Sequence, residues 1–205
     1  MKPIYLTAIL CTAFLGIARA QWPENLVVEG VPEIPADLKE QAGRYLEFRS
    51  AGFSGWHPRA WEMFVLTRFA DVTQLHRVAM AGGARRQLTF GKEPIREAVV
   101  QPKDGNYVVF LRDTGGGEFY QLFRLDLDTG QTTLLTDGRS RNLGPRFARG
   151  GQLMAYTSTR RNGRDNDLYL MNPAQPDSNR LLLEVKGGGW SVSDWSPDEK
   201  QLLVT

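Results

Sequence analysis

The residues of this chain that could support nucleophilic catalysis are two histidines, His57 and His76, and the serine of the segment Gly52–Gly55 (GFSG). A nucleophile elbow requires Gly-x-Ser-x-Gly at a strand-to-helix turn. Ser54 has the wrong spacing to its glycines and no such context. A histidine base also needs a nucleophile and a carboxylate beside it, and neither accompanies these histidines in the sequence. We therefore predict no catalytic residue in this chain, and interpret both histidines as ordinary positions in repeated strands and turns.

Metal-binding and phosphate-binding patterns are equally incomplete. The segment Arg164–Asp167 (RDND) has two aspartates at a calcium-loop spacing, but it lacks the further ligands and the glycine of an EF-hand loop. The triplets Gly115–Gly117 and Gly187–Gly189 lack the Lys-Ser/Thr pair that completes a phosphate-binding loop. The sequence predicts neither a metal site nor a cofactor site.

Charge is close to balanced, with 25 Lys+Arg against 23 Asp+Glu. Loss of an N-terminal leader containing Lys2 and Arg19 would leave 23 of each, and a neutral chain lacks the basic stripe of a nucleic-acid-binding protein. Two basic segments stand out, Arg139–Arg141 and Arg160–Arg161. We interpret them as solvated loop charge, with contact to a peptide or protein partner as the alternative.

The N-terminus has the order of a secretory signal peptide. Lys2 precedes an apolar stretch, Ile4–Ile17, which is followed by the A-x-A cleavage site Ala18–Ala20. A buried N-terminal helix is the alternative. Cys11 could suggest a lipoprotein anchor, but bulky Leu10 precedes it where a small residue is required. We predict cleavage after Ala20, a periplasmic or secreted product, and no membrane association after cleavage.

Three sets of residues recur at a period of about 47 positions, which is the strongest signal in the sequence. An aromatic or apolar residue marks each unit, at intervals of 44, 47 and 48: Trp56, Val100, Phe147 and Trp195. A second set is separated by 47 and 46 positions: Leu75, Leu122 and Leu168. A third is separated by 47 and 47: Leu88, Leu135 and Leu182.

Each unit contains short, β-rich runs separated by turns. Apolar strands are expected in Met63–Leu66, Tyr107–Leu111, Leu153–Tyr156 and Leu202–Val204. Hairpin turns are expected at Ala81–Gly83 and Asp128–Gly130, and a longer, proline-containing turn at Asn172–Asn179. Four-stranded meanders repeated every 40 to 50 residues are typical of propeller blades. The sequence therefore predicts an all-β fold, a partial β-propeller of about three four-stranded blades plus the start of a fourth.

The expected organisation has three parts: residues 1–20 as signal peptide, residues 21–50 as an extended segment with one short helix, and residues 51–205 as the partial propeller. The helix is expected at Ala36–Phe48, with an apolar face that would pack onto the propeller or a following domain. Thr205 is expected within the first strand of a fourth blade, so we interpret the chain as a truncated frame or a fragment with an unclosed ring. Such a ring is expected to have poor independent stability.

Several segments resemble a known family: Trp56–Pro58 (WHP), Thr67–Asp71 (TRFAD), Gln74–Val78 (QLHRV), Gly82–Arg85 (GGAR) and Gln87–Phe90 (QLTF). They resemble the opening propeller of bacterial prolyl oligopeptidase-family serine peptidases, including the dipeptidyl aminopeptidase and acylaminoacyl-peptidase-like members. Trp195–Asp198 (WSPD) also resembles the more widespread TolB-type propeller repeat. The resemblance extends from about Val27 to the end of the chain.

This resemblance implies a propeller of seven or eight blades that caps an α/β-hydrolase domain carrying a Ser-Asp-His triad. No position of this chain matches the triad, so none of the family's catalytic residues is carried over. The resemblance implies a non-catalytic propeller portion that gates and scaffolds peptide access to the hydrolase domain, which would be its partner. The alternative is a TolB-like module that binds protein partners, and a third interpretation is a non-functional remnant.

Overall fold

The computed structural model describes residues 26–46, 48–187 and 189–205, of which residues 26–46 belong to a first unit and those from Phe48 onward to a second. The predicted signal peptide and Cys11 lie outside the described residues. Within the described part of the chain, no helix is long and apolar enough to cross a membrane.

The first unit contains the predicted helix, α1 (Ala36–Leu46). Asp37 in its first turn and Arg44 in its last turn match the helix dipole. The helix has no buried residue, and its apolar side chains Leu38, Tyr45 and Leu46 are 53%, 81% and 67% exposed. The apolar face predicted from the sequence is therefore present, and it is exposed.

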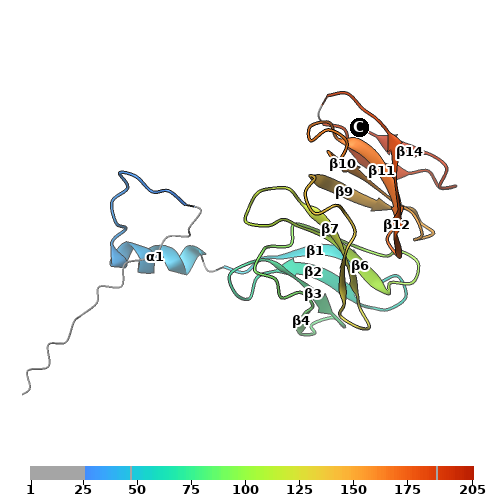
Figure 1. Ribbon diagram of the computed structural model, residues 1–205. Coiled ribbons are helices and arrows are strands. Elements are labelled where there is room, and N and C mark those ends of the chain that lie inside the picture. Colours follow the sequence, from blue (N-terminus) through green and yellow to red (C-terminus); the bar gives the residue numbers. More distant parts are fainter. Residues whose placement is uncertain (1–25, 47, 188) are drawn as a thin grey trace, which may run out of the picture. The chain divides into compact units, whose positions relative to one another are not determined.

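The second unit consists of antiparallel sheets, each formed by consecutive strands (Figure 1). Blade 1 comprises β1 (Ala51–Trp56), β2 (Met63–Thr67), β3 (Gln74–Val78) and β4 (Arg85–Gln87). Blade 2 comprises β5 (Glu97–Val100), β6 (Tyr107–Arg112), β7 (Gln121–Asp126) and β8 (Thr132–Leu134). Blade 3 comprises β9 (Asn142–Phe147), β10 (Met154–Ser158), β11 (Asp167–Asn172) and β12 (Gln175–Leu183). A two-stranded sheet follows, β13 (Val192–Trp195) and β14 (Leu202–Val204).

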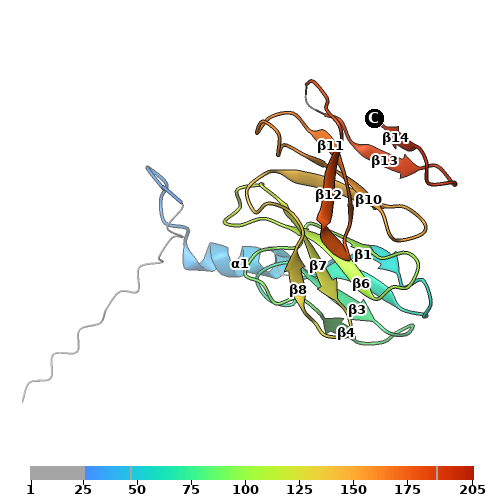
Figure 2. The same ribbon diagram turned by 45° about the vertical axis from the view of Figure 1, so that its right-hand side comes forward.

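The repeat predicted from the sequence is present in the structure. Leu75, Leu122 and Leu168 are each the second residue of the third strand of their blade, and they are 0%, 0% and 1% exposed. The first set of markers is also equivalent, because its members are the last residues of the first strands β1, β5, β9 and β13. The fold is a partial β-propeller with three complete blades (Figure 2).

Blade 3 departs from the pattern at the third marker, since Leu183, next to Leu182, pairs with Leu168 at a register shift between β11 and β12. Two details of the sequence interpretation are wrong. The turn predicted at Asn172–Asn179 is shorter, since Asn172 pairs directly with Gln175 and the later residues belong to β12. Finally, the strand before Thr205 is β14, the second strand of its sheet rather than the first.

Each third strand begins with a buried polar residue that fastens the link to the next sheet. The Gln74 amide donates to the carbonyl oxygens of Gly91 and Glu93 at 3.0 and 3.1 Å. The Gln121 amide donates to the carbonyl of Ser140 at 2.6 Å. In blade 3 the equivalent residue is Asp167, which accepts from the Val185 N–H at 2.9 Å. These bonds satisfy linker groups that would otherwise be costly to bury.

Apolar side chains fill the space between successive sheets. The equivalent leucines of the third strands each face the next sheet: Leu75 lies in the cluster shared by blades 1 and 2, Leu122 in that shared by blades 2 and 3, and Leu168 in that shared by blade 3 and β13. Full burial of such a side chain is worth roughly 1.5–3 kcal/mol. Packing between sheets is therefore the main source of stability.

Polar contacts between neighbouring sheets join residues that are about one repeat apart in the sequence. The Gln101 amide donates to the Gly151 carbonyl, 50 positions along the chain, at 3.3 Å. One repeat later, the N–H of Gly150 donates to the carboxylate of Glu199. Between blades 1 and 2, Arg59 pairs with Asp104 at 2.6 Å. All three contacts join turns that lie between the first and second strands of neighbouring sheets. A polar contact therefore links these turns at each sheet boundary.

Candidate functional site

His57 shapes a turn after β1. Its Nδ1 accepts the backbone N–H groups of Arg59 and Ala60, both at 3.1 Å, and its ring stacks on Phe64 with centroids 6.5 Å apart. The ring also lies directly against Gly105 of blade 2, where a Cβ atom would be 2.5 Å from Nε2. Gly105 has a φ of +70°, so glycine is required there for both conformation and space. The structure places His57 at the boundary between two blades.

His76 lies inside blade 1, at the position that Phe123 and Tyr169 occupy in the next two blades. It is 0% exposed, and Nδ1 lies 3.0 Å from the Gln74 carbonyl oxygen. The Phe69 and His76 rings pack edge to face with their centroids 4.7 Å apart. The Nε2 atom of His76 has no hydrogen-bond partner among the described residues. Burial lowers the pKa of His76, so the imidazole is neutral near pH 7.

Ser54 lies inside strand β1, at the irregularity between Phe53 and Gly55 in the pairing with β2. This is the edge strand of an antiparallel sheet, whereas a nucleophile elbow lies on a strand-to-helix turn. The context of Ser54 is therefore a strand, and the absence of a catalytic role stays a prediction.

The aspartates of the segment Arg164–Asp167 face an arginine. Nε of Arg161 lies 2.6 Å from an oxygen of buried Asp167, and Nη2 lies 3.4 Å from Asp165. The hydrogen bond from Arg161 holds the pKa of Asp167 below its ordinary value. Within the described residues, no group of three or more His, Cys, Asp or Glu could hold a metal ion. The interpretation of Arg161 as solvated loop charge is wrong, because it neutralises a buried carboxylate.

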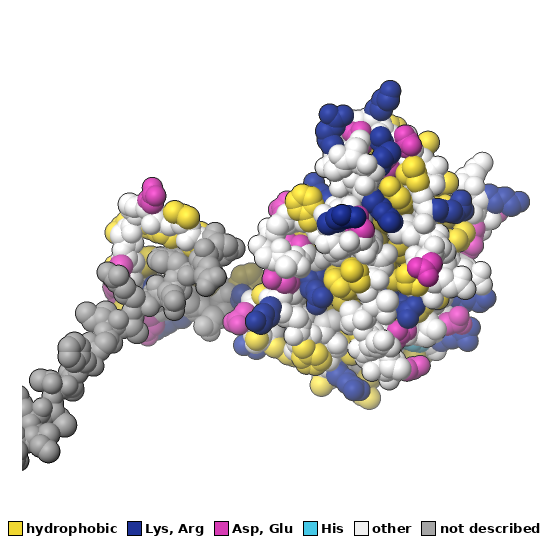
Figure 3. Space-filling view, in the orientation of Figure 1, with side chains coloured by type: hydrophobic (Ala, Val, Ile, Leu, Met, Phe, Trp, Pro, Cys, Tyr) yellow, Lys and Arg dark blue, Asp and Glu magenta, His cyan; other side chains and the backbone are white. Residues whose placement is uncertain are grey.

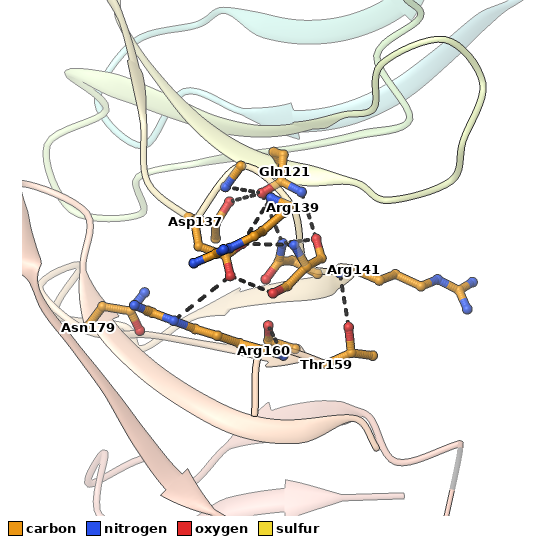
Figure 4. A network of polar contacts seen from close by, with 12 residues as sticks. Gln121, Asp137, Arg139, Arg141, Thr159, Arg160 and Asn179 are labelled. Atoms are coloured by element: carbon orange, nitrogen blue, oxygen red, sulfur yellow. Dashed lines mark hydrogen bonds and ion pairs between the residues drawn. The ribbon is translucent and has the colours of Figure 1, made fainter. Parts of the chain in front are cut away.

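The link from blade 2 to blade 3 forms a second polar network (Figure 4). Asp137 accepts the backbone N–H of Ser140 at 2.9 Å and its hydroxyl at 2.5 Å, and Arg160 lies 4.0 Å away. The Gln121 side-chain oxygen accepts from the hydroxyl of Thr136 at 2.8 Å and the N–H of Gly138 at 3.0 Å. The hydrogen bonds of Asp137 and Gln121 therefore hold the link in place, and Arg160 lies beside it with a side chain that is still 47% exposed.

The two glycine triplets turn the chain. Gly115 and Gly116 have φ values of 65° and 70° in the connection between β6 and β7, and Gly187 and Gly189 have φ values of 85° and 94° between β12 and β13. Residues other than glycine rarely adopt this conformation. The Gly115 N–H donates to the carboxylate of Glu93 at 3.1 Å, so one triplet also contacts the preceding link.

A groove lies where the first strands of the three blades end, and we call it the axial groove. It has a volume of about 350 Å³ and is lined by Ser54, Gly55, Trp56, Pro58, Val99, Val100, Pro102, Pro145, Arg146 and Phe147. β1 contacts β5, and β9 contacts β13, so the first strands are the ones that meet near the axis. The lining is mostly apolar and proline-rich.

One ion pair fixes the charged side chain of the axial groove. Arg146 contacts Glu97 at 2.7 Å, and its backbone carbonyl accepts from the indole N–H of Trp195 at 2.9 Å. Trp56 is 62% exposed, so much of its indole is free for a ligand. Sequence reasoning missed this groove. The sequence did contain a signal for it, because three of the four residues in the first set of repeat markers line the groove: Trp56, Val100 and Phe147.

Lys and Arg side chains gather over the end of the second unit that carries the loops around β10 and β11 (Figure 3). The β10–β11 loop carries Arg160, Arg161 and Arg164, and each of them lies within 4.0 Å of an aspartate. This basic end adjoins the links between blades rather than the axial groove.

No protein-family model matches the chain, and no curated protein matches it. Solved structures similar to it include a putative TolB from Agrobacterium tumefaciens, with 18% identity and a TM-score of 0.57 over 76% of this chain and 58% of that one. A structure from a study of two prolyl endopeptidases has 16% identity and a TM-score of 0.58, over 76% of this chain and 26% of that one. The tricorn protease has 14% identity and a TM-score of 0.54, over 69% of this chain and 14% of that one.

These similarities support the TolB-like propeller fold and, at such identities, the fold alone. This chain spans 58% of the TolB structure and 26% of the prolyl endopeptidase structure. The fold predicted from the repeat is confirmed, while the resemblance to one peptidase family stays a prediction.

Proposed function

We propose that this chain is the non-catalytic propeller portion of an exported prolyl oligopeptidase-like serine peptidase, in which the axial groove holds peptides and limits their access to a hydrolase domain. The observation that carries the proposal is the groove itself. Three successive blades each contribute the end of a first strand to one shared, mostly apolar surface. A propeller with such a surface near its axis is suited to receive an extended chain.

The chemistry of the groove favours a peptide over a small polar metabolite. Trp56 and Phe147 offer aromatic surface, and three prolines give a rigid lining. The single arginine of the lining is already paired with Glu97. Ligand pockets are mainly apolar with a few placed polar groups, and aromatic side chains contribute strongly to binding energy.

The positions of the histidines and of Ser54 support a non-catalytic role. His57 is held by two backbone donors, His76 is buried inside a blade, and Ser54 lies within a strand. Acyl-transfer chemistry needs a nucleophile, an adjacent base and an oxyanion hole in one place. We expect no hydrolysis of fluorogenic Ala-Pro or acyl-amino-acid substrates. A rate that Ser54→Ala or His57→Ala abolished would contradict this.

The proposal is tested by peptide binding to the chain starting at Gln21. A labelled, unstructured, proline-containing peptide with an amidated C-terminus is titrated and followed by fluorescence anisotropy. Trp56→Ala is expected to weaken binding roughly 10-fold or more, as expected for an aromatic anchor. The control is Trp61→Ala, because Trp61 is 93% exposed and does not line the axial groove. Equal loss in both variants, or no binding, would refute the proposal.

A TolB-like module that binds a folded protein partner is the second candidate, and the similarity to the TolB structure favours it. The two candidates differ in what the gene encodes. A hydrolase domain with a Gly-x-Ser-x-Gly elbow in the coding sequence downstream of Thr205 supports the peptidase, and its absence from the complete gene supports the binding module.

A further inference from the structure

A second pocket lies at the boundary of blades 2 and 3, away from the axial groove. Its volume is about 480 Å³, and its lining comes from the β6–β7 loop (Gly117, Glu118, Phe119), the β10–β11 loop (Thr159, Gly163, Arg164, Asn166), and Arg141 and Gly189 of the links. Arg141 immediately precedes the first residue of β9, whereas the axial groove lies at the end of that strand. The two sites are therefore at opposite ends of β9.

Arg141 is the central charged group of this pocket. Its backbone is fixed, since the N–H donates to Thr159 Oγ1 at 3.1 Å and the carbonyl accepts from the Thr159 N–H at 3.0 Å. Its side chain extends away from the neighbouring polar network (Figure 4). Nε is buried and has no hydrogen-bond partner among the described residues. A buried guanidinium nitrogen without an acceptor is costly, and an anionic acceptor that reached it would remove that cost.

Thr159 provides a second, independent donor. The residue is 5% exposed, and its Oγ1 accepts the Arg141 N–H. Within the described residues, its hydroxyl hydrogen has no acceptor, although the residue lines the pocket. Buried hydroxyl groups normally donate as well as accept. Arg164 adds a second guanidinium at the rim, where its side chain is 85% exposed and its Nε lies 3.4 Å from Asp165, leaving the other guanidinium nitrogens for a ligand.

We propose that this pocket binds the carboxylate group of a peptide, with the Arg141 guanidinium as the principal donor and the Thr159 hydroxyl and Arg164 as supporting donors. The planar fork of an arginine matches the two oxygens of a carboxylate. Glu118 also lines the pocket and repels a singly charged carboxylate less than a doubly charged phosphate. The 56% exposed ring of Phe119 offers apolar contact to a neighbouring side chain. The inference goes beyond the proposed function and does not depend on a hydrolase domain.

The test compares three fluorescein-labelled peptides of one sequence: a free C-terminal acid, its amide, and an amide with one added Asp. Anisotropy is measured with the chain from Gln21 and with two variants, Arg141→Gln and the matched charge control Arg139→Gln. Arg139 is in the same link and does not line the pocket. The free acid is expected to bind at least roughly 10-fold more tightly than the amide, and Arg141→Gln is expected to remove that difference.

Each outcome decides the inference. If the Asp-containing amide binds as tightly as the free acid and loses binding in Arg141→Gln, the carboxylate site stands and accepts an acidic side chain. If the acid and the amide bind equally, or both variants weaken binding to the same extent, the inference is overturned. Circular dichroism of Arg141→Gln that matches the parent chain confirms that its fold is intact.

Discussion

Truncation of Leu122 to alanine should be among the more costly substitutions in the chain. Leu122 is 0% exposed and lies in the cluster between blades 2 and 3, among Tyr107, Leu111 and Tyr156. Alanine removes three carbon atoms, worth about 2.4 kcal/mol at about 0.8 kcal/mol for each buried methylene. The cavity adds to that cost, and buried leucine-to-alanine changes span about 2–5 kcal/mol. We expect a loss of about 3 kcal/mol in the free energy of unfolding.

The matched control is Leu134→Ala, one strand away in β8. Leu134 is 44% exposed, so the same truncation should cost less than about 1 kcal/mol. Urea unfolding of the chain from Gln21, followed by tryptophan fluorescence, measures both changes at constant m-value. If Leu122→Ala unfolds the chain completely, Leu122→Met provides a milder test with an expected cost under about 1.5 kcal/mol. Equal costs for Leu122→Ala and Leu134→Ala would refute the packing argument.

Three further predictions concern the turns, the buried carboxylate and the N-terminus. Gly105→Ala should destabilise the chain more than Gly130→Ala in urea unfolding, because both have positive φ but only at Gly105 would the new Cβ meet the His57 ring; equal effects would contradict this. The pKa of Asp167 is lowered in the folded state. The ionised carboxylate therefore stabilises the fold above about pH 4, and this stabilisation is lost as pH falls through the folded-state pKa. Asp167→Asn should flatten the acid limb of the stability curve below about pH 4, and an unchanged curve would refute that. Export should yield a product beginning at Gln21, and an intact mass that retains residues 1–20 would exclude cleavage after Ala20.

The periodic features of the fold were predictable from the sequence. A residue in the same place of each blade experiences the same packing, so Leu75, Leu122 and Leu168 could be aligned before any strand was placed. The sequence did not predict where one blade departs from the pattern. The register shifts in β12 move the partner of Leu168 to Leu183, and this bulge depends on pairing between strands rather than on local composition.

The candidate sites were much less predictable. Arg161 and Arg160 were assigned to solvent because sequence neighbours cannot show that buried Asp167 and partly buried Asp137 face them. The axial groove combines three segments about 45 residues apart, and the carboxylate pocket combines four separate loops. Such surfaces arise only when the blades pack together, so a single repeat carries no sign of them.

Photo-crosslinking tests the central claim most directly. A proline-containing peptide with an amidated C-terminus and a central photoreactive residue is crosslinked to the chain from Gln21, and the products are mapped by mass spectrometry. The account predicts crosslinks at the ends of the first strands, in residues 54–58, 99–102 and 145–147, and their loss with excess unlabelled peptide. Crosslinks confined to the outer strands β4, β8 and β12, or none above a scrambled, proline-free control peptide, would contradict the claim that this propeller holds peptides near its axis.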